Sequence, residues 1–545
     1  MAEKDVGGEA RRVLRLGAPI AVLRIANFFP KAFMLAYVGR LHSGATMVAA
    51  AGTATMWCNI TGVSLLVGTG LGGATLLSQA YGAKNYYRCG LILQRQMLIH
   101  ALLICIISWP LALFSETLLR DLLKQPPDTS ALAAKFIMWR APALPFMAIN
   151  VNISSFLISQ GQPRLSALAN VVTSLALVPV LATLTRDSGM LSLGFIGAPI
   201  SLTVAEIIEG CFLVALTPST LRRADQVKGS NRHYATLPRV GRWRDWRLAT
   251  RGWCEMLKLG MPAAVMTLAE WFGWESCLFT AGQLCGGETC EQLEAFPIVS
   301  QTMVISFMIH YGFATAASAR IGNALGAGNA DGAKLAAKAA YLITTLIVTV
   351  NCSIILLFKE RWTGFFVSDS SPSLQSTVSQ VLPYVVLYIF FDALGPSASH
   401  QVLIGLGHIR FAAVFNVFAF WFVGVPLGIA LTKRGLGIEG LWMGLDVGMV
   451  LLVAALISYI AFRVNWPNAA ATARSKALGE TSQADAEDST KRSSVEIDMP
   501  LHQIGNRSDA SCFSAKSHAT RTTWDSGEES TKDARKSDVP FNMEI

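Results

Sequence analysis

The sequence predicts an all-α polytopic membrane protein with twelve transmembrane helices, arranged as two pseudo-symmetric six-helix bundles. Hydrophobic residues make up 52% of the chain and charged residues only 15%, with a mean hydropathy of +0.43. A soluble protein carries about 25% charged residues. Apolar stretches of the roughly 20 residues that a bilayer span requires recur along the chain. Short motifs from the first half of the chain also reappear in the second half.

The apolar stretches account for most of the chain before residue 463. Each is long enough to cross the hydrocarbon core, and polar or glycine-rich connections separate it from the next. The first begins directly after a polar N-terminus, so we expect no cleavable signal peptide. The predicted spans cover residues 14–38, 46–77, 89–114, 131–158, 165–184, 190–216, 254–284, 295–318, 335–358, 376–404, 411–432 and 436–462.

Lysine and arginine are distributed unevenly between the two sets of loops. The N-terminus and the connections after even-numbered spans carry most of them, above all the segment 217–253. Positively charged loops tend to face the cytoplasm, so both termini are predicted to be cytoplasmic. This asymmetry and attraction to anionic lipid explain the formal net charge of +9. No nucleic-acid partner is expected.

Several strings recur in the same order at a nearly constant offset. "LGAPIAV" (16–22) matches "LGMPAAV" (259–265), and "SQAYGAKN" (78–85) matches "GNALGAGN" (322–329). An ordered set of such matches indicates a duplicated six-helix unit. Because six is an even number, both copies begin on the same side of the membrane, as parallel repeats do.

The repeat divides the chain into four regions. A basic, turn-rich segment joins the two lobes and is expected to lie on anionic headgroups. After the last span the composition changes to Ser, Thr, Ala and mixed charge, which is typical of disorder. The predicted regions are a first lobe at 1–216, a cytoplasmic linker at 217–253, a second lobe at 254–466 and a disordered cytoplasmic tail at 467–545.

Two acidic residues interrupt the seventh span, in the string "TLAEWFGWES" (267–276). An ionisable side chain at mid-membrane costs about 2.5–3.5 kcal/mol on insertion scales and is usually functional. Glu270 shares a helix face with Trp274, and Glu275 shares another with Trp271. A carboxylate beside an indole offers a cation both a charge and a π face. The alternative is a neutral acid that hydrogen-bonds between packed helices.

Asp392 places a third carboxylate in the tenth span, just before a Gly-Pro pair. The proline removes a backbone hydrogen bond and leaves carbonyl groups for other partners. We predict that Glu270, Asp392 and Glu275 bind and release a proton or another cation. The ionisable chemistry is concentrated in the second lobe, because the equivalent positions of the first lobe hold Asn27, Phe146 and Ala32.

Other polar groups within the predicted spans rank below these acids. His310 and Tyr311 in the eighth span are expected to face the carboxylates of the second lobe. The remaining buried polar side chains either pair with one another or extend toward the membrane surface. They are Arg24, Lys31, Arg140, Glu206, Glu209 and Asp446.

Motifs of several enzyme classes are absent from the sequence. It has no phosphate-binding Gly-x-x-x-x-Gly-Lys-Ser/Thr loop, no His-Glu-x-x-His zinc motif and no Gly-x-Ser-x-Gly nucleophile turn. The protein is therefore not expected to be an enzyme or to hold a metal or cofactor. The energy for transport is expected to come from a gradient of protons or sodium ions.

Cys285 and Cys290 flank a short loop on the predicted outer side. A disulfide between them is one alternative, because such bonds persist in oxidising compartments. Two free thiols are the other alternative, since spacing alone does not establish disulfide geometry.

Motifs along residues 10–465 resemble those of the multidrug and toxin extrusion (MATE) transporters of eukaryotic type. The resemblance implies two six-helix bundles in a V-shaped molecule, a central cleft, and alternating access driven by entry of protons or sometimes sodium. The matching strings are "NITGVSLLVGTGLGGATLLSQAYGAKN" (59–85), "LQRQ" (93–96), "PALP" (142–145), "AEWFGWES" (269–276), "ARIGNALGAGN" (319–329), "GVPLGIAL" (424–431) and "GLWMGL" (440–445).

The same resemblance assigns roles to particular residues. Glu270 matches a cation-coupling glutamate of helix 7, and Asp392 matches the coupling acid of helix 10. Glu275 matches a second helix-7 glutamate of animal members, and Asn59 matches a polar position of helix 2. Together with Trp271, Trp274, His310, Tyr311 and Asn27, Asn59 is a candidate residue of the substrate cleft.

Three features depart from the family pattern. The first span lacks the aspartate of prokaryotic relatives, so a proton site in the first lobe is in doubt. The helix-8 glutamate of animal drug exporters is replaced by Gln292 or displaced to Glu291 or Glu294, which puts organic-cation specificity of the animal type in doubt. A long polar tail replaces any thirteenth helix.

The leading functional hypothesis is an antiporter that exports organic cations or xenobiotics in exchange for protons. One alternative is export of organic anions through Arg24, Lys31 and Arg140, and a less favoured one is a lipid-linked-oligosaccharide flippase of the same superfamily. A scaffold or receptor without transport activity is the remaining alternative. We expect a monomer in the plasma membrane or a vacuolar or other organelle membrane, with a small organic molecule and protons as partners.

Overall fold

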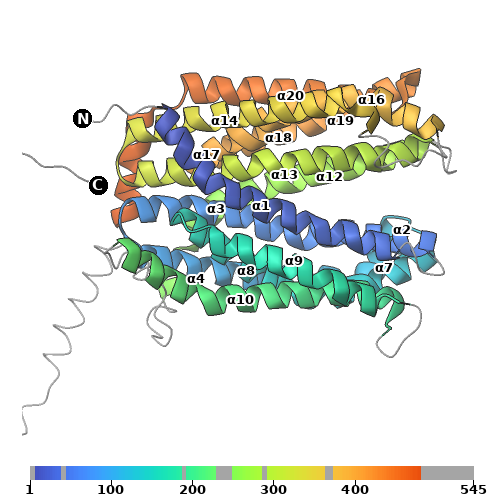
Figure 1. Cartoon of the computed structure of the whole chain (residues 1–545), viewed down its shortest axis with the longest axis horizontal. Helices are drawn as coiled ribbons and strands as arrows, with labels where there is room; N and C mark the ends of the chain where they lie inside the picture. Colours follow the sequence, from blue (N-terminus) through green and yellow to red (C-terminus); the bar gives the residue numbers. More distant parts are fainter. Residues whose placement is uncertain are drawn as a thin grey trace, which may run out of the picture. The chain divides into compact units, whose positions relative to one another are not determined.

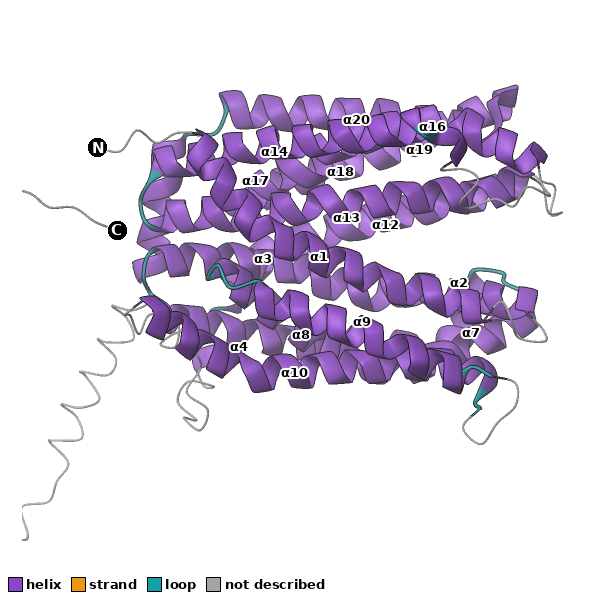
Figure 2. Ribbon diagram, viewed as in Figure 1, coloured by secondary structure: helices purple, strands orange, loops and turns teal. Residues whose placement is uncertain are grey.

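A computed structural model describes residues 6–38, 44–186, 192–228, 248–284, 291–361 and 372–479. These residues form helices joined by short turns (Figures 1 and 2). Nine helical stretches of the described chain are long and apolar enough to cross a membrane, and the one at Ile409–Phe462 contains two of the predicted spans. The long helices α1 and α12 match the predicted first and seventh spans. The predicted all-α membrane fold is confirmed, and the arrangement is consistent with twelve spans.

The first half of the chain forms six helical runs. Several of them pass through short π-helical or 3-10 segments without ending. The runs are α1 (Val6–Val38); α2 (Gly44–Cys58), η1 (Asn59–Val63) and α3 (Ser64–Gly82); α4 (Tyr86–Leu103), η2 (Ile104–Ser108) and α5 (Trp109–Leu113); α7 (Pro127–Arg140), η4 (Ala141–Ala143) and α8 (Leu144–Ser159); α9 (Arg164–Leu184); and α10 (Gly197–Lys228).

The second half repeats this order. Its fourth and fifth runs contain π-helical segments. Each of these segments includes a proline or a glycine, which interrupts the regular hydrogen bonding. The runs are α12 (Trp253–Leu284); α13 (Glu291–Gly326); α14 (Ala330–Leu357); α16 (Pro372–Asp392), η7 (Ala393–Ser399) and α17 (His400–Leu406); α18 (Ile409–Val417), η8 (Phe418–Gly424), α19 (Val425–Leu431) and η9 (Thr432–Leu436); and α20 (Gly437–Phe462).

The repeated glycine motifs form a seam between the two halves. Helix α3 packs against α12 and α13, and a Cβ atom on Gly82 would lie 2.0 Å from the backbone oxygen of Asn323. Hydrogen bonds cross the same seam, from Thr75 Oγ1 to the carbonyl of Ile404 at 2.7 Å and from Asn323 Nδ2 to the carbonyl of Ser159 at 3.1 Å. The motifs lack large side chains because the two backbones meet there.

An additional helix follows α20 over residues 466–479, which we call the strap. Asn465 caps it by accepting a hydrogen bond from the backbone N–H of Asn468 at 3.1 Å. Its buried positions are Trp466, Ala470, Ala473 and Ala477, the spacing of one helix face. Asn85 Nδ2 donates to the carbonyl of Ala477 at 2.8 Å, so the strap reaches the first half.

Two predicted boundaries need correction. The polar composition after residue 466 was interpreted as disorder, but residues 467–479 are helical because an Asn cap and an alanine-rich face support a packed helix. The predicted linker begins inside α10, which continues to Lys228. Residues 229–247, residues 480–545 and the Cys285–Cys290 pair lie outside the described residues.

Candidate functional site

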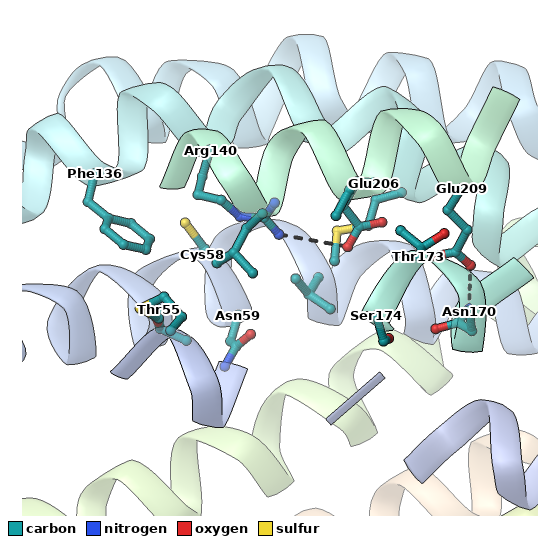
Figure 3. Close-up of a pocket in the computed structure, with 15 residues that line it drawn as sticks. Thr55, Cys58, Asn59, Phe136, Arg140, Asn170, Thr173, Ser174, Glu206 and Glu209 are labelled. Carbon is teal, nitrogen blue, oxygen red and sulfur yellow. Dashed lines mark hydrogen bonds and ion pairs between the residues drawn. The ribbon is translucent and has the colours of Figure 1, made fainter. Parts of the chain in front are cut away.

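A cavity of about 70 Å³ lies within the first half (Figure 3). Its walls come from five of the six helical runs of that half. Asn59, at the start of the π-helical segment η1, lies on one wall, and π-helical insertions are frequent at functional sites. The polar lining residues are Thr55, Asn59, Arg140, Asn170, Thr173, Ser174, Glu206 and Glu209.

The cavity contains two carboxylates and one guanidinium. Glu206 and Glu209 lie one turn apart on α10 and therefore share a face. Arg140 Nη2 approaches Glu206 Oε1 at 3.8 Å, and Asn150 Nδ2 donates to Glu206 Oε2 at 2.9 Å. Asn170 donates a hydrogen bond to Glu209. With both acids ionised the cavity carries a net negative charge, which favours cations over anions.

A second group of polar side chains lies in the other half, around Asp392 at the end of α16. Asp392 is 2% exposed, and its Oδ2 lies 3.8 Å from His310 Nε2. That distance is too long for a hydrogen bond, and neither atom has another hydrogen-bond partner in the described chain. His310 Nδ1 instead pairs with Ser397 Oγ at 2.9 Å, within η7. Asp392 is therefore buried without a lysine or arginine partner in the part of the chain that the structure describes, and its nearest basic group is the imidazole of His310.

Glu270 lies close to this group, on α12. The side chain is half-buried, and its carboxylate interacts electrostatically with Asp392, Tyr388 and Tyr311. The structure thus brings together the two acids predicted to couple transport. Glu275 is also half-buried on α12, and no interaction connects it to the other two acids within the described residues.

Aromatic rings enclose the carboxylates of the second half. Trp274 packs edge-on against Tyr388, with ring centroids 5.1 Å apart, and lies 5.3 Å from Trp442. Tyr311 stacks on Phe307 at 4.7 Å. The guanidinium of Arg24, from α1 of the first half, lies 5.1 Å above the Tyr311 ring, which is a cation–π distance.

Comparison with known proteins identifies the chain. The MatE family profile matches it twice, at residues 19–183 and 262–430. The chain belongs to the MATE family of transporters. It is 32% identical to multidrug and toxin extrusion protein 1 of Oryctolagus cuniculus over 92% of this chain and 82% of that protein. It is 31% identical to multidrug and toxin extrusion protein 2 of Mus musculus over 87% and 78% of the two chains.

Solved structures share the fold of this MATE transporter. The eukaryotic MATE transporter AtDTX14 superposes with a TM-score of 0.75 at 23% identity, over 87% of this chain and 100% of that one. An outward-facing multidrug resistance MATE family transporter superposes with a TM-score of 0.70 at 17% identity, over 85% and 96%. The predicted family and its implied class, a multidrug efflux transporter and not an enzyme, are confirmed.

The predicted site residues of this MATE transporter fall into three groups. Asn59 lines the cavity of the first half. Glu270, Asp392, Trp274, His310 and Tyr311 gather in the second half, while Glu275 and Trp271 are half-buried on α12 outside that group. The side chains of Asn27 and Lys31 lie outside the described residues.

Sequence reasoning ranked several residues of these two regions too low or passed over them. Glu206 and Glu209 are expected from the sequence only to pair or to extend toward the surface, and Arg140 is given a substrate role only under the organic-anion alternative, yet all three line the cavity. The strings "YIFFD" (388–392) and "WMGLD" (442–446) share an aromatic residue four positions before an aspartate. That shared spacing is the signal that would have drawn attention to Tyr388, Trp442 and Asp446.

Proposed function

We propose that this MATE transporter exports organic cations in exchange for protons, by alternating access, with Glu270 and Asp392 as the coupling acids. The observation that supports this proposal most is the buried Asp392 without a cationic partner. A carboxylate in that position is stable when it holds a proton or a cation. Release of that ion to one side and uptake from the other provides the coupling.

The charged residues also favour cations over anions as substrates. Arg140 lies 3.8 Å from Glu206, and the two carboxylates of the cavity outweigh its single positive charge. Arg24 lies over the Tyr311 ring beside the acids of the second half. Relatives at about 31% identity are named multidrug and toxin extrusion proteins. The acid-lined cavity offers no arginine cluster for a lipid-linked oligosaccharide.

The remaining parts of the proposal concern orientation and the outer acid. We infer from the basic loops that the end of the molecule with the strap faces the cytoplasm, in either the plasma membrane or an organelle membrane. Glu275 lies farther along α12 from that end than Glu270, and its role is to attract cations toward the inner pair.

Flux measurements with the purified protein in proteoliposomes test this function. A panel of organic cations and anions is loaded, and a pH gradient or a sodium gradient is imposed separately. We expect cation efflux that follows the pH gradient in the parent protein and is lost in Glu270→Gln. Efflux of anions only, or full pH-driven efflux in Glu270→Gln, would contradict the proposal. Cation efflux that depends on the sodium gradient alone would identify sodium, in place of the proton, as the coupling ion.

A further inference from the structure

Asp446 is a buried carboxylate that the proposed function does not use. It lies on α20 and is 5% exposed. Neither of its oxygens has a hydrogen-bond partner within the described part of the chain. An ionised carboxylate is strongly disfavoured in such surroundings unless a proton or a cation accompanies it.

The packing of α16 against α20 places Asp446 near Asp392. The rings of Tyr388 and Trp442 lie 5.5 Å apart, and each precedes its aspartate by one helical turn. Farther along, Gly395 lies against Val453. The two helices therefore run in the same direction, and both aspartates lie between these two contacts. The Tyr388 hydroxyl has no hydrogen-bond partner among the described residues and interacts electrostatically with both carboxylates.

No buried base neutralises Asp446 among the described residues of the surrounding helices. The fifth run of the second half has basic residues near its two ends, and all of them are exposed: Arg410, Lys433 and Arg434. Tyr388 on α16 interacts electrostatically with both aspartates and with Glu270 and Cys277 on α12, and His310 on α13 lies 3.8 Å from Asp392. The site therefore has an excess of negative charge when its acids ionise.

We propose that Asp446 is a third ion-binding carboxylate, which binds a second monovalent cation, a proton or a sodium ion, on the other side of Tyr388 from Asp392. Both aspartates are almost fully buried, at 2% and 5% exposed, so a small ion fits beside them more readily than an organic molecule. The proposal rests on the proposed function, because it adds one ion to the same coupling site. It also gives the paired aromatic–aspartate spacing a role: the two rings set the register of the two acids.

Ion release on substrate binding tests this assignment. Purified protein in detergent is mixed with saturating tetraethylammonium, and the protons released per protein are counted with an indicator dye. In a parallel experiment the protein is first loaded with radioactive sodium, and the sodium released on mixing is counted. We expect Asp446→Asn to release about half as many ions as the parent, because one of the two ions no longer binds. Asp331→Asn, an exposed aspartate at the start of α14, serves as the matched control and should release the parental number.

A second variant tests the proposal if Asp446→Asn does not fold. Asp446→Thr introduces the residue that stands at the equivalent position of the first half, Thr203. Parental ion release from either folded variant would overturn the role of Asp446 alone. A parent protein that binds tetraethylammonium and releases neither ion would overturn the proposed function as well.

A separate observation concerns the strap, which is bonded to both halves. Its buried face packs into the core of the second half through Trp466, Ala470 and Ala473. Its last turn is held by the first half, where Asn85 and Arg88 donate hydrogen bonds to the carbonyls of Ala477 and Lys476. The last carbonyls of a helix lack partners within the helix and carry partial negative charge, so an arginine there is favourable.

Arg88 extends the connection to a third element. Its Nη2 forms an ion pair with Glu255 Oε2 at 2.8 Å, at the start of α12, and the Arg88 side chain is 4% exposed. The strap therefore covers the same end of the molecule at which the glycine motifs form the seam. Separation of the halves at this end must break the contacts of Asn85 and Arg88 with the strap.

We infer that the strap is a latch that favours the state in which this end is closed. The test uses a matched pair of substitutions on the strap: Ala473→Glu at a buried position and Ala471→Glu at an exposed one. The reporter is a cysteine that replaces Thr75 in the seam, a position 1% exposed in the parent. The rate at which this cysteine reacts with a soluble maleimide is measured, and the reaction of the native cysteines is subtracted as background.

We expect Ala473→Glu to speed labelling about tenfold, because a buried unpaired charge displaces the strap. Ala471→Glu should label at the parental rate. Arg88→Gln, which removes the contact from the other side, is the second variant if Ala473→Glu does not fold. Parental labelling rates in either of these folded variants would show that the strap does not hold the end closed.

Discussion

The two halves of this transporter share one fold but treat buried charge differently. In the first half the acids of α10 have partners, since Glu206 approaches Arg140 and Glu209 accepts from Asn170. In the second half Asp392 and Asp446 retain oxygens without partners in the described chain. A paired acid is stable on its own, whereas an unpaired buried acid requires an ion.

Two asparagines at equivalent positions of the two halves show the same difference. Asn170 and Asn416, which follow the matching strings "QGQPR" (160–164) and "GLGHIR" (405–410) in the two halves, are both buried. Asn170 donates to Glu209, but both polar atoms of the Asn416 side chain lack partners in the described chain. Duplication therefore preserved the scaffold while the polar groups diverged. This difference supports the proposal that ion coupling takes place in the second half, where buried carboxylate oxygens have no partner among the described residues.

The largest expected effect is loss of coupling in the second half. Asp392→Asn keeps the side-chain shape but cannot ionise, so pH-driven exchange should fall at least about 100-fold. The double variant with Glu270→Gln should be no worse than either single variant, because residues that act as a unit are not additive. The measurement is pH-driven flux in proteoliposomes, normalised to reconstituted protein. An additive double variant would indicate two independent sites.

The next largest effect is expected in stability, where substitutions in the two halves should differ. Arg140→Gln leaves Glu206 partly buried without its guanidinium and should lower the free energy of unfolding by about 1–3 kcal/mol. The double variant Arg140→Gln/Glu206→Gln should recover most of that loss. Asp392→Asn, by contrast, should not destabilise the protein. Thermal unfolding in detergent measures all three, and a destabilised Asp392→Asn would indicate a partner for that acid.

Much of the fold and part of the site could be predicted from the sequence, for physical reasons. Length and apolarity determine the spans, and recurring glycine motifs such as "SQAYGAKN" (78–85) reveal the duplication because backbones meet there. The pairing of Arg140 with Glu206 could not be predicted, since those residues come from helices far apart in the chain. The strap was missed because its buried face consists mainly of alanine, which composition alone does not distinguish from a tail.

A smaller effect is expected at the first-half position equivalent to Glu270. Asn27→Ala should change substrate affinity or turnover by a few-fold at most, because an amide contributes one or two hydrogen bonds. It should leave the pH dependence of transport unchanged, since an amide does not titrate near neutrality. Transport rate against pH is compared for the parent, Asn27→Ala and Glu270→Asp. A shifted profile in Asn27→Ala with none in Glu270→Asp would place the proton site in the first half.

The smallest expected effect concerns Glu9, which precedes the predicted first span and forms an ion pair that joins the two halves. Glu9, near the start of α1, accepts hydrogen bonds from Arg320 Nε at 2.7 Å and Nη2 at 3.1 Å, at the end of α13, and from Arg12 at 3.1 Å. Burial acts to raise the pKa of the Glu9 carboxyl, but the hydrogen bonds and charges of Arg320 and Arg12 outweigh it and leave the pKa below its ordinary value of 4.5.

Because the pKa of Glu9 is lower in the folded protein than in the unfolded chain, its stabilising effect is present above about pH 4.5 and is lost as the pH falls through the lowered value. The gain is about 1 kcal/mol, since solvent and salt screen a partly accessible pair. We therefore expect Glu9→Gln to lower Tm by roughly 1 °C at pH 7. The difference from the parent should shrink in high salt and decline as the pH falls through the lowered pKa of Glu9. A difference that persists unchanged as the protein is acidified to its unfolding limit would mean that Glu9 stabilises the joint between the halves through packing and not through its charge.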